Sequence, residues 1–183
     1  MNQARLQALL DKQDILDCLT RFSRGMDRFD RDLYLSAFHH DAEMAAGPYV
    51  GDAPGCWDWA QPMHESMQIL THHALLNHTV EFDGDTAHSE CYYMFVARNH
   101  PYGGGTEESL MLAGGRYIDR FERRDGTWKI ALRTNVIEWS GLPPALPLPF
   151  GDVPDIVVNG MTARDKSDPS YARPLTNQRK KTN

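Results

Sequence analysis

The apolar residues of this 183-residue chain change at Thr71 from a helical spacing to the alternation that is typical of β-strands. After that point the pattern predicts four long strands, at residues 71–82, 86–98, 108–123 and 127–139. Two tight-turn sequences, Asp83-Gly84-Asp85 and Arg124-Asp125-Gly126, join the first pair and the last pair of these strands. Because strands that follow one another through short turns pair antiparallel, we expect an α+β fold and not an alternation of strands and helices.

Helices are predicted for most of the chain before Thr71. The first expected helix covers residues 3–26, and a second, short helix begins at Asp30 and is stopped by His39-His40-Asp41. A short strand over 42–49 and a turn over 51–55 should follow. The last helix is expected over 56–70, where Pro62 interrupts or kinks it. Asp30 suits the N-cap of the second helix because its carboxylate can accept a hydrogen bond from a free backbone N–H. Within the third strand, Gly114-Gly115 predicts a bulge or a sharp bend, which is how a sheet is curled.

The length of the chain suffices for one domain with a substantial core, but not for two. We therefore expect one domain over residues 1–140 and an extended, proline-rich tail over residues 141–183. Four of the eleven prolines lie between Leu142 and Pro149, and the segment from Asp165 to Asn183 is polar. We expect this tail to pack on the surface of the domain or on a neighbouring subunit before it frays.

Charge and cysteine usage exclude several classes of partner. The formal net charge of -6 does not favour a nucleic acid or an anionic membrane as partner. No apolar run reaches the roughly 20 residues that a membrane-spanning helix needs.

The three cysteines, Cys18, Cys56 and Cys91, show neither metal nor disulfide spacing. Their odd number, together with the lack of a signal sequence, predicts a cytoplasmic protein.

Two adjacent histidines, His72 and His73, lie within the apolar segment that predicts the first long strand. Histidine is the only side chain whose unperturbed pKa lies near neutral pH. Asp27, at the end of the first helix, is the best-placed partner, and an aspartate–histidine pair over an apolar cavity can transfer protons. Strand alternation puts His72 and His73 on opposite faces, so only one of them can enter the cavity.

The sequence contains no pattern that predicts a metal or another cofactor. The eight histidines include no pair four residues apart in a helix and no His-x-His pair in a strand. Neither a dinucleotide-binding fingerprint nor a phosphate-binding loop is present, and no nucleophile elbow is found. We therefore expect chemistry that uses only the side chains of the protein.

The order and spacing of these segments resemble the SnoaL-like, nuclear transport factor 2-like superfamily, whose fold is a cone-shaped α+β barrel. The resemblance covers about residues 5–140 and is carried by Gly25–Asp30, Phe38–Ala42, Thr71–Asn77, Asp83–Ala87 and Gly115–Ile130. It is closest to the branch that contains scytalone dehydratase, bile-acid 7α-dehydratase and hexachlorocyclohexane dehydrochlorinase. That branch uses an aspartate after the first helix and a histidine in the first long strand, which match Asp27 and His73. The dehydrochlorinase also has an arginine shortly after the Trp-Lys of its last strand, which Arg133 matches.

The resemblance implies that His73 is a general base, that Asp27 orients it, and that Arg133 stabilises developing negative charge. Each residue also has a structural alternative. Asp27 can cap the helix or the following turn, and His73 can be a hydrogen-bonded core residue. Arg133 can form a structural ion pair.

Aromatic residues are expected to line an apolar cavity that binds a hydrophobic or aromatic ligand. The candidate lining residues are Phe22, Tyr49, Tyr93, Phe95 and Trp139. Tyr49 can serve as an acid at the mouth of the cavity. All of these side chains can instead belong mainly to the core.

The function that the resemblance implies is that of a cofactor-independent lyase, a dehydratase or a related eliminase. Its substrate is expected to be a hydrophobic cyclic molecule such as a steroid, a polyketide or an aromatic-pathway intermediate. The alternatives are an isomerase or cyclase that uses the same base, and a non-catalytic ligand-binding domain or dioxygenase small-subunit-like domain. The resemblance also implies a homo-oligomer, a trimer or alternatively a dimer, and a partner can cover the apolar open face of a curved sheet.

Overall fold

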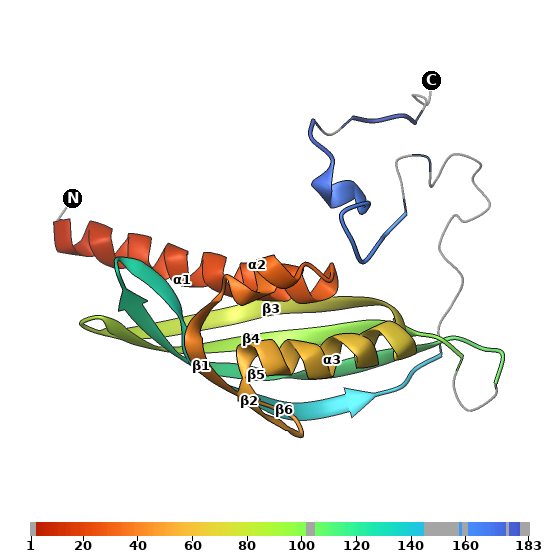
Figure 1. Ribbon diagram of the computed structural model, residues 1–183, viewed down its shortest axis with the longest axis horizontal. Helices are drawn as coiled ribbons and strands as arrows, with labels where there is room; N and C mark the ends of the chain where they lie inside the picture. Colours follow the sequence, from red (N-terminus) through yellow and green to blue (C-terminus); the bar gives the residue numbers. More distant parts are fainter. Residues whose placement is uncertain (1–2, 102–104, 145–157, 159–160, 175, 180–183) are drawn as a thin grey trace.

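The computed structural model describes residues 3–101, 105–144, 158, 161–174 and 176–179. Its helices are α1 (Gln3–Asp27), α2 (Arg31–Leu35) and α3 (Ala53–Met67), with a short 3-10 helix, η1, at Pro169–Tyr171. Its strands are β1 (Phe38–Ala46), β2 (Tyr49–Asp52), β3 (Gln68–Asp83), β4 (Thr86–Asn99), β5 (Ser109–Arg124) and β6 (Thr127–Gly141). The strands form one six-stranded sheet in the order β2-β1-β6-β5-β4-β3 (Figure 1). β1 and β6 pair parallel, and the other neighbouring strands pair antiparallel.

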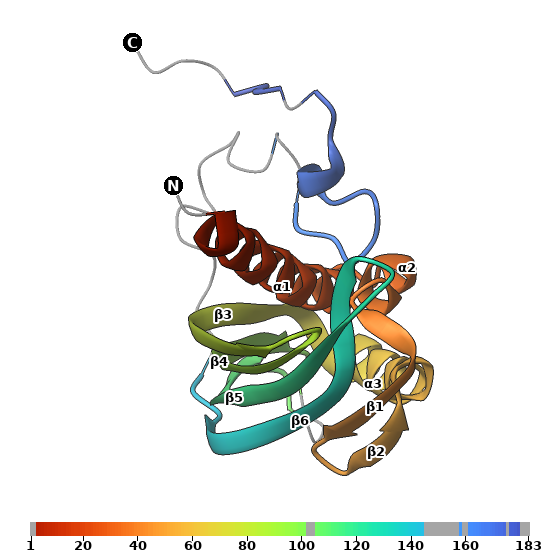
Figure 2. The same ribbon diagram turned by 90° about the vertical axis from the view of Figure 1, so that its left-hand side faces the viewer.

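The sheet curls strongly, and helices cover its concave side. Figure 2 shows the sheet wrapping from β3 round to β2, with α1 and α3 lying across the opening. α1 contacts β3 and β6, and α3 contacts β1, β2 and β3. This arrangement confirms the predicted fold, a cone-shaped α+β barrel with N-terminal helices packed on a curved antiparallel sheet.

One face of α1 fills much of the space inside the cone. Ile15, Leu19 and Phe22 are buried, and their spacing of three or four residues puts them on the same side of the helix. They belong to one apolar cluster together with Phe121 and Ile130 of the sheet. Burial of each such side chain contributes about 1.5–3 kcal/mol. This packing fixes the position of α1, and with it the position of Asp27 at the end of the helix.

The predicted bulge or bend at Gly114-Gly115 of β5 coincides with a shift of register against β6, and the extra residue of this bulge lies in β6. A Cβ atom on Gly115 would lie 2.0 Å from the carbonyl oxygen of Val136. A Cβ atom on Gly114 would overlap the ring of Trp139. Because these two residues have no side chains, β6 can lie close against β5 where the sheet bends.

Gly115→Ala is expected to destabilise the protein by about 1–3 kcal/mol, which is the usual cost of forcing an extra methyl group into packed structure. Urea denaturation of the variant and the wild type would measure this change. Gly141→Ala is a matched control, because no described atom lies within 4 Å of a Cβ atom built at that position. Equal stability of the two variants would show that close approach at Gly115 does not matter.

The segment before α3 differs from the prediction of one strand over 42–49 and a turn over 51–55. The chain forms a hairpin of β1 and β2 instead, with its turn at Gly47 in a left-handed conformation (φ +59°). His39-His40-Asp41 belongs to β1 and does not end α2. Asp52 is the N-cap of α3, where its carboxylate accepts a hydrogen bond from the Gly55 N–H at 2.7 Å, so the helix covers 53–67 and not 56–70. The parallel pairing of β1 with β6 draws these residues into the sheet, and local patterns do not reveal such a contact.

The described part of the C-terminal segment packs on the end of α1 in the same chain. Asp168 lies 3.4 Å from Nε of Arg28, and the Tyr171 hydroxyl donates a hydrogen bond to Asp30 at 3.1 Å. This agrees with a tail that packs on the surface of the domain. Most of the proline-rich stretch, residues 145–149, lies outside the described residues, and the domain boundary at residue 140 stays a prediction.

Candidate active site

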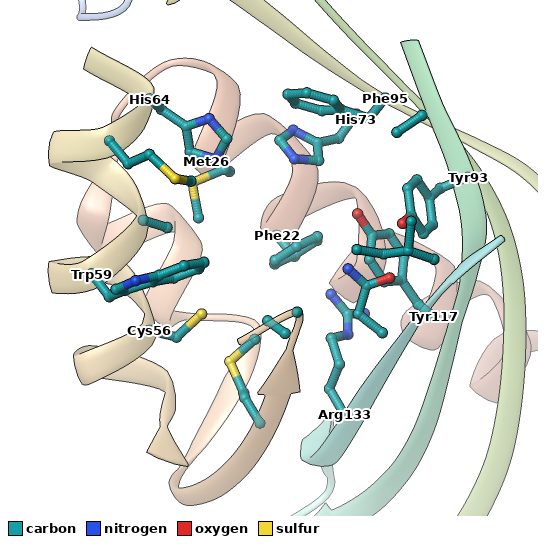
Figure 3. A pocket seen from close by; sticks show the side chains of 18 of the residues that line it. Phe22, Met26, Cys56, Trp59, His64, His73, Tyr93, Phe95, Tyr117 and Arg133 are labelled. Atoms are coloured by element: carbon teal, nitrogen blue, oxygen red, sulfur yellow. The ribbon is translucent and has the colours of Figure 1, made fainter. Parts of the chain in front are cut away.

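A largely apolar cavity lies between the helices and the concave face of the sheet (Figure 3). Its volume of about 360 Å³ falls within the range of about 300–1,000 Å³ that is usual for ligand pockets. Residues of α1, α3 and the strands contribute to its walls. The described lining residues are Phe22, Met26, Met44, Ala46, Gly47, Pro48, Cys56, Trp59, Ala60, Met63, His64, His73, Tyr93, Phe95, Met111, Ala113, Tyr117, Arg133, Asn135 and Ile137.

Asp27, the last residue of α1, holds His73 of β3 in a fixed orientation. Oδ1 of Asp27 lies 2.6 Å from Nδ1 of His73, and Oδ2 accepts a hydrogen bond from the His73 backbone N–H at 2.9 Å. The Thr71 hydroxyl donates another hydrogen bond to Oδ1 at 2.9 Å. Because a carboxylate only accepts hydrogen bonds, Nδ1 of His73 carries the proton and Nε2 has the free lone pair. No described residue hydrogen-bonds to this Nε2, and the His73 ring lines the cavity.

The surroundings of the pair keep Asp27 ionised. Burial opposes ionisation, but the interactions with His73 and Thr71 more than offset it and hold the pKa of Asp27 below its ordinary value of 3.8. The rings of Phe22 and Phe95 lie with their centroids 6.2 Å and 4.8 Å from that of His73. Such apolar walls strengthen electrostatic interactions by excluding water.

His72 lies on the opposite face of β3, as the strand alternation predicts. Its side chain is exposed, whereas that of His73 is about 10% exposed. The register of β3 against β4, in which His73 pairs with Phe95, therefore turns His73 and not His72 into the cavity.

Arg133 of β6 is buried in the wall of the same cavity. Nε and Nη2 donate to the two carboxylate oxygens of Asp119, each at 2.7 Å, and both side chains are at most 1% exposed. The guanidinium lies between the rings of Phe22 and Tyr117, at 4.1 Å and 4.3 Å from their centroids. Burial disfavours its charge, but Asp119 more than offsets this and raises the pKa of Arg133. Nη1 is buried as well, and it has no hydrogen-bond partner among the described residues.

Phe22, Tyr93 and Phe95 line the cavity, whereas the other two aromatic candidates lie outside it. Tyr49 stacks on Trp59 with the ring centroids 5.8 Å apart, and its hydroxyl donates to the Asp52 carbonyl at 3.0 Å. Trp139 covers Gly114 on the outer face of the sheet.

A bulge in β6 explains the position of Trp139. Arg133, Asn135 and Ile137 alternate into the cavity, and a regular strand would continue this alternation to Trp139. However, Gly114 pairs with Trp139 while Gly115 pairs with Ile137, so one extra residue in β6 reverses the alternation.

Four polar residues of the site were not predicted from the sequence: His64, Tyr117, Asp119 and Asn135. The spacing of α3 contains a signal for His64, because positions 56, 59, 60, 63 and 64 lie on one face of a helix and all line the cavity. Nδ1 of His64 hydrogen-bonds to Oε1 of Gln68. Burial lowers the pKa of His64 from 6.5 to about 4. His64 is therefore neutral at neutral pH.

The buried His64 makes the stability of the protein depend on pH. The unfolded chain takes up a proton at this residue near pH 6.5, whereas the folded protein does so only near pH 4, so acidification between these values favours unfolding. Since one pKa unit corresponds to about 1.4 kcal/mol, the loss is about 3 kcal/mol. His64→Gln is expected to lose less stability than the wild type between pH 6.5 and pH 4 in urea denaturation. A variant that loses as much as the wild type would contradict this role of His64.

Two negative findings concern only the part of the chain that the structure describes. No three histidine, cysteine, aspartate or glutamate side chains there lie close enough together to hold a metal ion. No helix there combines the length and the apolar character that are needed to cross a bilayer.

The fold and the site define a small α+β protein with an apolar cavity and a hydrogen-bonded aspartate–histidine pair in its wall. Residues 7–134 match the family model of the SnoaL-like domain. The match covers more than half of the chain, so the protein belongs to this family, in agreement with the resemblance of its sequence. No match was found among curated proteins.

Solved structures with the same fold include two whose names refer to elimination reactions. A hexachlorocyclohexane dehydrochlorinase, LinA type 2, is 22% identical with a TM-score of 0.69, over 80% of this chain and 99% of that chain. A putative scytalone dehydratase from Novosphingobium aromaticivorans is 16% identical with a TM-score of 0.63, over 79% of this chain and 95% of that chain. A variant of Rv3472, a protein of unknown function from Mycobacterium tuberculosis, is 21% identical with a TM-score of 0.57, over 71% of this chain and 77% of that chain. At these identities the likeness shows the fold alone.

Proposed function

We propose that this protein is a cofactor-independent lyase that removes water or a halide from a hydrophobic cyclic substrate, such as a steroid, a polyketide or an aromatic-pathway intermediate. One observation carries the proposal: Nε2 of His73, whose tautomer Asp27 fixes, shares an apolar cavity with the buried guanidinium of Arg133. A base and a cation that share an apolar cavity are suited to an elimination that needs no cofactor.

In the proposed reaction, Nε2 of His73 takes a proton from a substrate carbon. The electrons of the broken C–H bond form a carbon–carbon double bond, and the leaving group departs from the neighbouring carbon with its bonding electrons. Asp27 stabilises the imidazolium that results, and Nη1 of Arg133 stabilises the negative charge on the leaving group. The released hydroxide or halide and the proton on His73 together make up the eliminated water or hydrogen halide.

The buried hydroxyl of Tyr117 can assist the departure of the leaving group. Burial raises the pKa of Tyr117, so its hydroxyl keeps its proton and can donate a hydrogen bond. The ring lies against the Arg133 guanidinium at 4.3 Å, so both donors lie in the same part of the cavity wall.

The names of structural neighbours support the same class of reaction. A dehydrochlorinase removes hydrogen chloride and a dehydratase removes water, and both reactions need a base and a site for an anionic leaving group.

We also propose a cytoplasmic location for the protein. The three cysteines in the described residues are buried free thiols, which supports this location.

A direct test supplies the purified protein with cyclic β-hydroxy ketones and chlorinated cyclohexanes in buffer that contains a metal chelator. Proton NMR in deuterated water would follow both the new double bond and the exchange of the acidic hydrogen. Formation of an alkene with release of water or chloride is the expected result. Deuterium exchange or a double-bond shift without release would instead support an isomerase or cyclase with the same base. Binding without any reaction would support a ligand-binding or dioxygenase small-subunit-like domain.

We also propose that the protein forms a homo-oligomer, a trimer or alternatively a dimer. The outer face of the sheet exposes Leu76, Tyr92, Met94 and Trp139, which form an apolar surface that a second copy can cover. Trp139→Glu is expected to shift sedimentation toward the monomer, because it puts a charge in this surface. Leu9→Glu is the control, since Leu9 is 60% exposed on α1, away from the sheet. A wild-type protein that sediments as a monomer at micromolar concentration would refute the oligomer.

A further inference from the structure

We infer that His64 is a specificity-determining residue, which accepts a hydrogen bond from a hydroxyl group that the substrate keeps through the reaction. This assignment rests on the proposed function, because it names the substrate class for the same cavity. The expected substrate is a hydrophobic ring system that carries a retained hydroxyl group near the carbon from which His73 takes the proton.

The hydrogen bond to Gln68 determines which nitrogen of His64 is available. Oε1 of Gln68 is an acceptor, so Nδ1 of His64 carries the proton and Nε2 has the free lone pair. Gln68 is only 6% exposed and begins β3, so its side chain has little freedom to move. Nε2 of His64 has no hydrogen-bond partner among the described residues, and the ring lines the cavity.

A residue of the C-terminal segment holds the end of α3 in place. Nη1 of Arg164 donates to the backbone carbonyls of His64 and Gln68, each at 2.8 Å. The guanidinium also lies 3.7 Å from the centroid of the Phe29 ring, in the turn that follows α1. Arg164 therefore ties the backbone of His64 to the end of the helix that carries Asp27.

The rings of His64 and His73 lie close together in the cavity wall. Figure 3 shows the His64 ring on α3 turned toward the His73 ring, and their centroids are 6.1 Å apart at an interplanar angle of 84°. Phe95 contacts both rings, with centroids 5.8 Å from His64 and 4.8 Å from His73. The cavity therefore has two adjacent imidazoles, each with a free Nε2 lone pair.

The protonation state of His64 restricts what it can bind. Because burial lowers its pKa to about 4, His64 is neutral near pH 7 and its Nε2 accepts but does not donate. It cannot give a proton to a leaving group. The group that it binds must therefore be a donor that stays on the substrate, whereas the leaving group is directed to the donors Arg133 and Tyr117. A ring system without a hydroxyl group would leave Nε2 of His64 unpaired and desolvated, which disfavours its binding.

Fluorescence titration with two probes tests the assignment without requiring turnover. The probes are 2-naphthol, which has a hydroxyl donor, and 2-methoxynaphthalene, which has none. We expect the wild type to prefer 2-naphthol, and His64→Phe to lower the ratio of the two affinities by about tenfold through loss of one buried hydrogen bond. His64→Gln, which keeps an acceptor, should recover part of the preference. His72→Phe is the matched control, because the same substitution on the exposed face of β3 should leave the ratio unchanged.

An unchanged ratio in a folded His64→Phe protein would overturn the assignment. Nitrogen-15 NMR of the histidine rings gives a second measurement that requires no variant. We expect a spectrum in which Nδ1 of His64 is protonated and Nε2 is not. A protonated Nε2 would refute the acceptor role. Failure of the proposed lyase reaction would appear only in the turnover assay, so it is distinguishable from failure of this binding preference.

Discussion

His73→Ala is expected to lower kcat by about two to four orders of magnitude with any substrate that the elimination assay identifies, which is the usual contribution of a positioned general base. The imidazole is the base in the proposed reaction, and its Nε2 lies in the cavity wall with no described partner. Steady-state rates of the variant and the wild type, measured with the same substrate, would give the ratio. The protein should stay folded, since His73→Ala leaves the Thr71 hydrogen bond to Asp27 in place.

Asp27→Asn belongs to the same test, because it changes the tautomer of His73 and leaves its position nearly unchanged. An amide can donate to Nδ1, which would move the proton to Nε2 and remove the lone pair that acts as the base. His72→Ala is the control for both variants, because its side chain is exposed on the far face of β3. Loss of activity in His72→Ala with normal activity in His73→Ala would show that the register of β3 is shifted by one residue.

Asp119→Ala is expected to destabilise the protein by about 3–5 kcal/mol, because it leaves the charge of Arg133 buried without a counterion. Both side chains are at most 1% exposed, so water cannot replace the missing carboxylate. Urea denaturation at neutral pH would measure the loss. Asp119→Ala combined with Arg133→Met should be less destabilised than Asp119→Ala alone, since the unpaired charge is then absent.

The exposed pair of Arg31 and Asp58 provides the control for this effect. These side chains are 3.9 Å apart and are 47% and 70% exposed, so Asp58→Ala should cost at most about 1 kcal/mol. Similar losses for Asp58→Ala and Asp119→Ala would contradict a buried charge pair in the cavity wall.

The class of fold followed from local patterns in the sequence. The helical spacing of Ile15, Leu19 and Phe22, the N-cap at Asp30 and the alternation after Thr71 all act over a few residues, so they can be recognised without the tertiary structure. The glycine pair in β5 also identified the bend of the sheet, because residues without side chains permit a close approach of strands.

The contact of Asp27 with His73 was expected from the two residue types and from the resemblance to a family. It joins residues 46 positions apart in the chain, and no periodicity specifies such a distance. Only the docking of α1 across the open side of the sheet brings the carboxylate to the histidine. The alternation within β3 predicted that His72 and His73 face opposite sides, because side chains of a strand alternate whatever the rest of the fold does. The choice of His73 as the residue in the cavity came from the resemblance.

Other features of the site depended on the tertiary structure alone. The pairing of Arg133 with Asp119 joins two different strands, and the approach of His64 to His73 joins a helix and a strand. Both contacts therefore follow from the register and curvature of the sheet. One extra residue in β6 moved Trp139 to the outer face, although its type suits a ligand cavity. Local preferences therefore determined α1, α2 and the four long strands, whereas the β1–β2 hairpin depended on pairing within the sheet. The side chains that share the cavity were decided by long-range packing, because a shift of one residue in a strand exchanges its two faces.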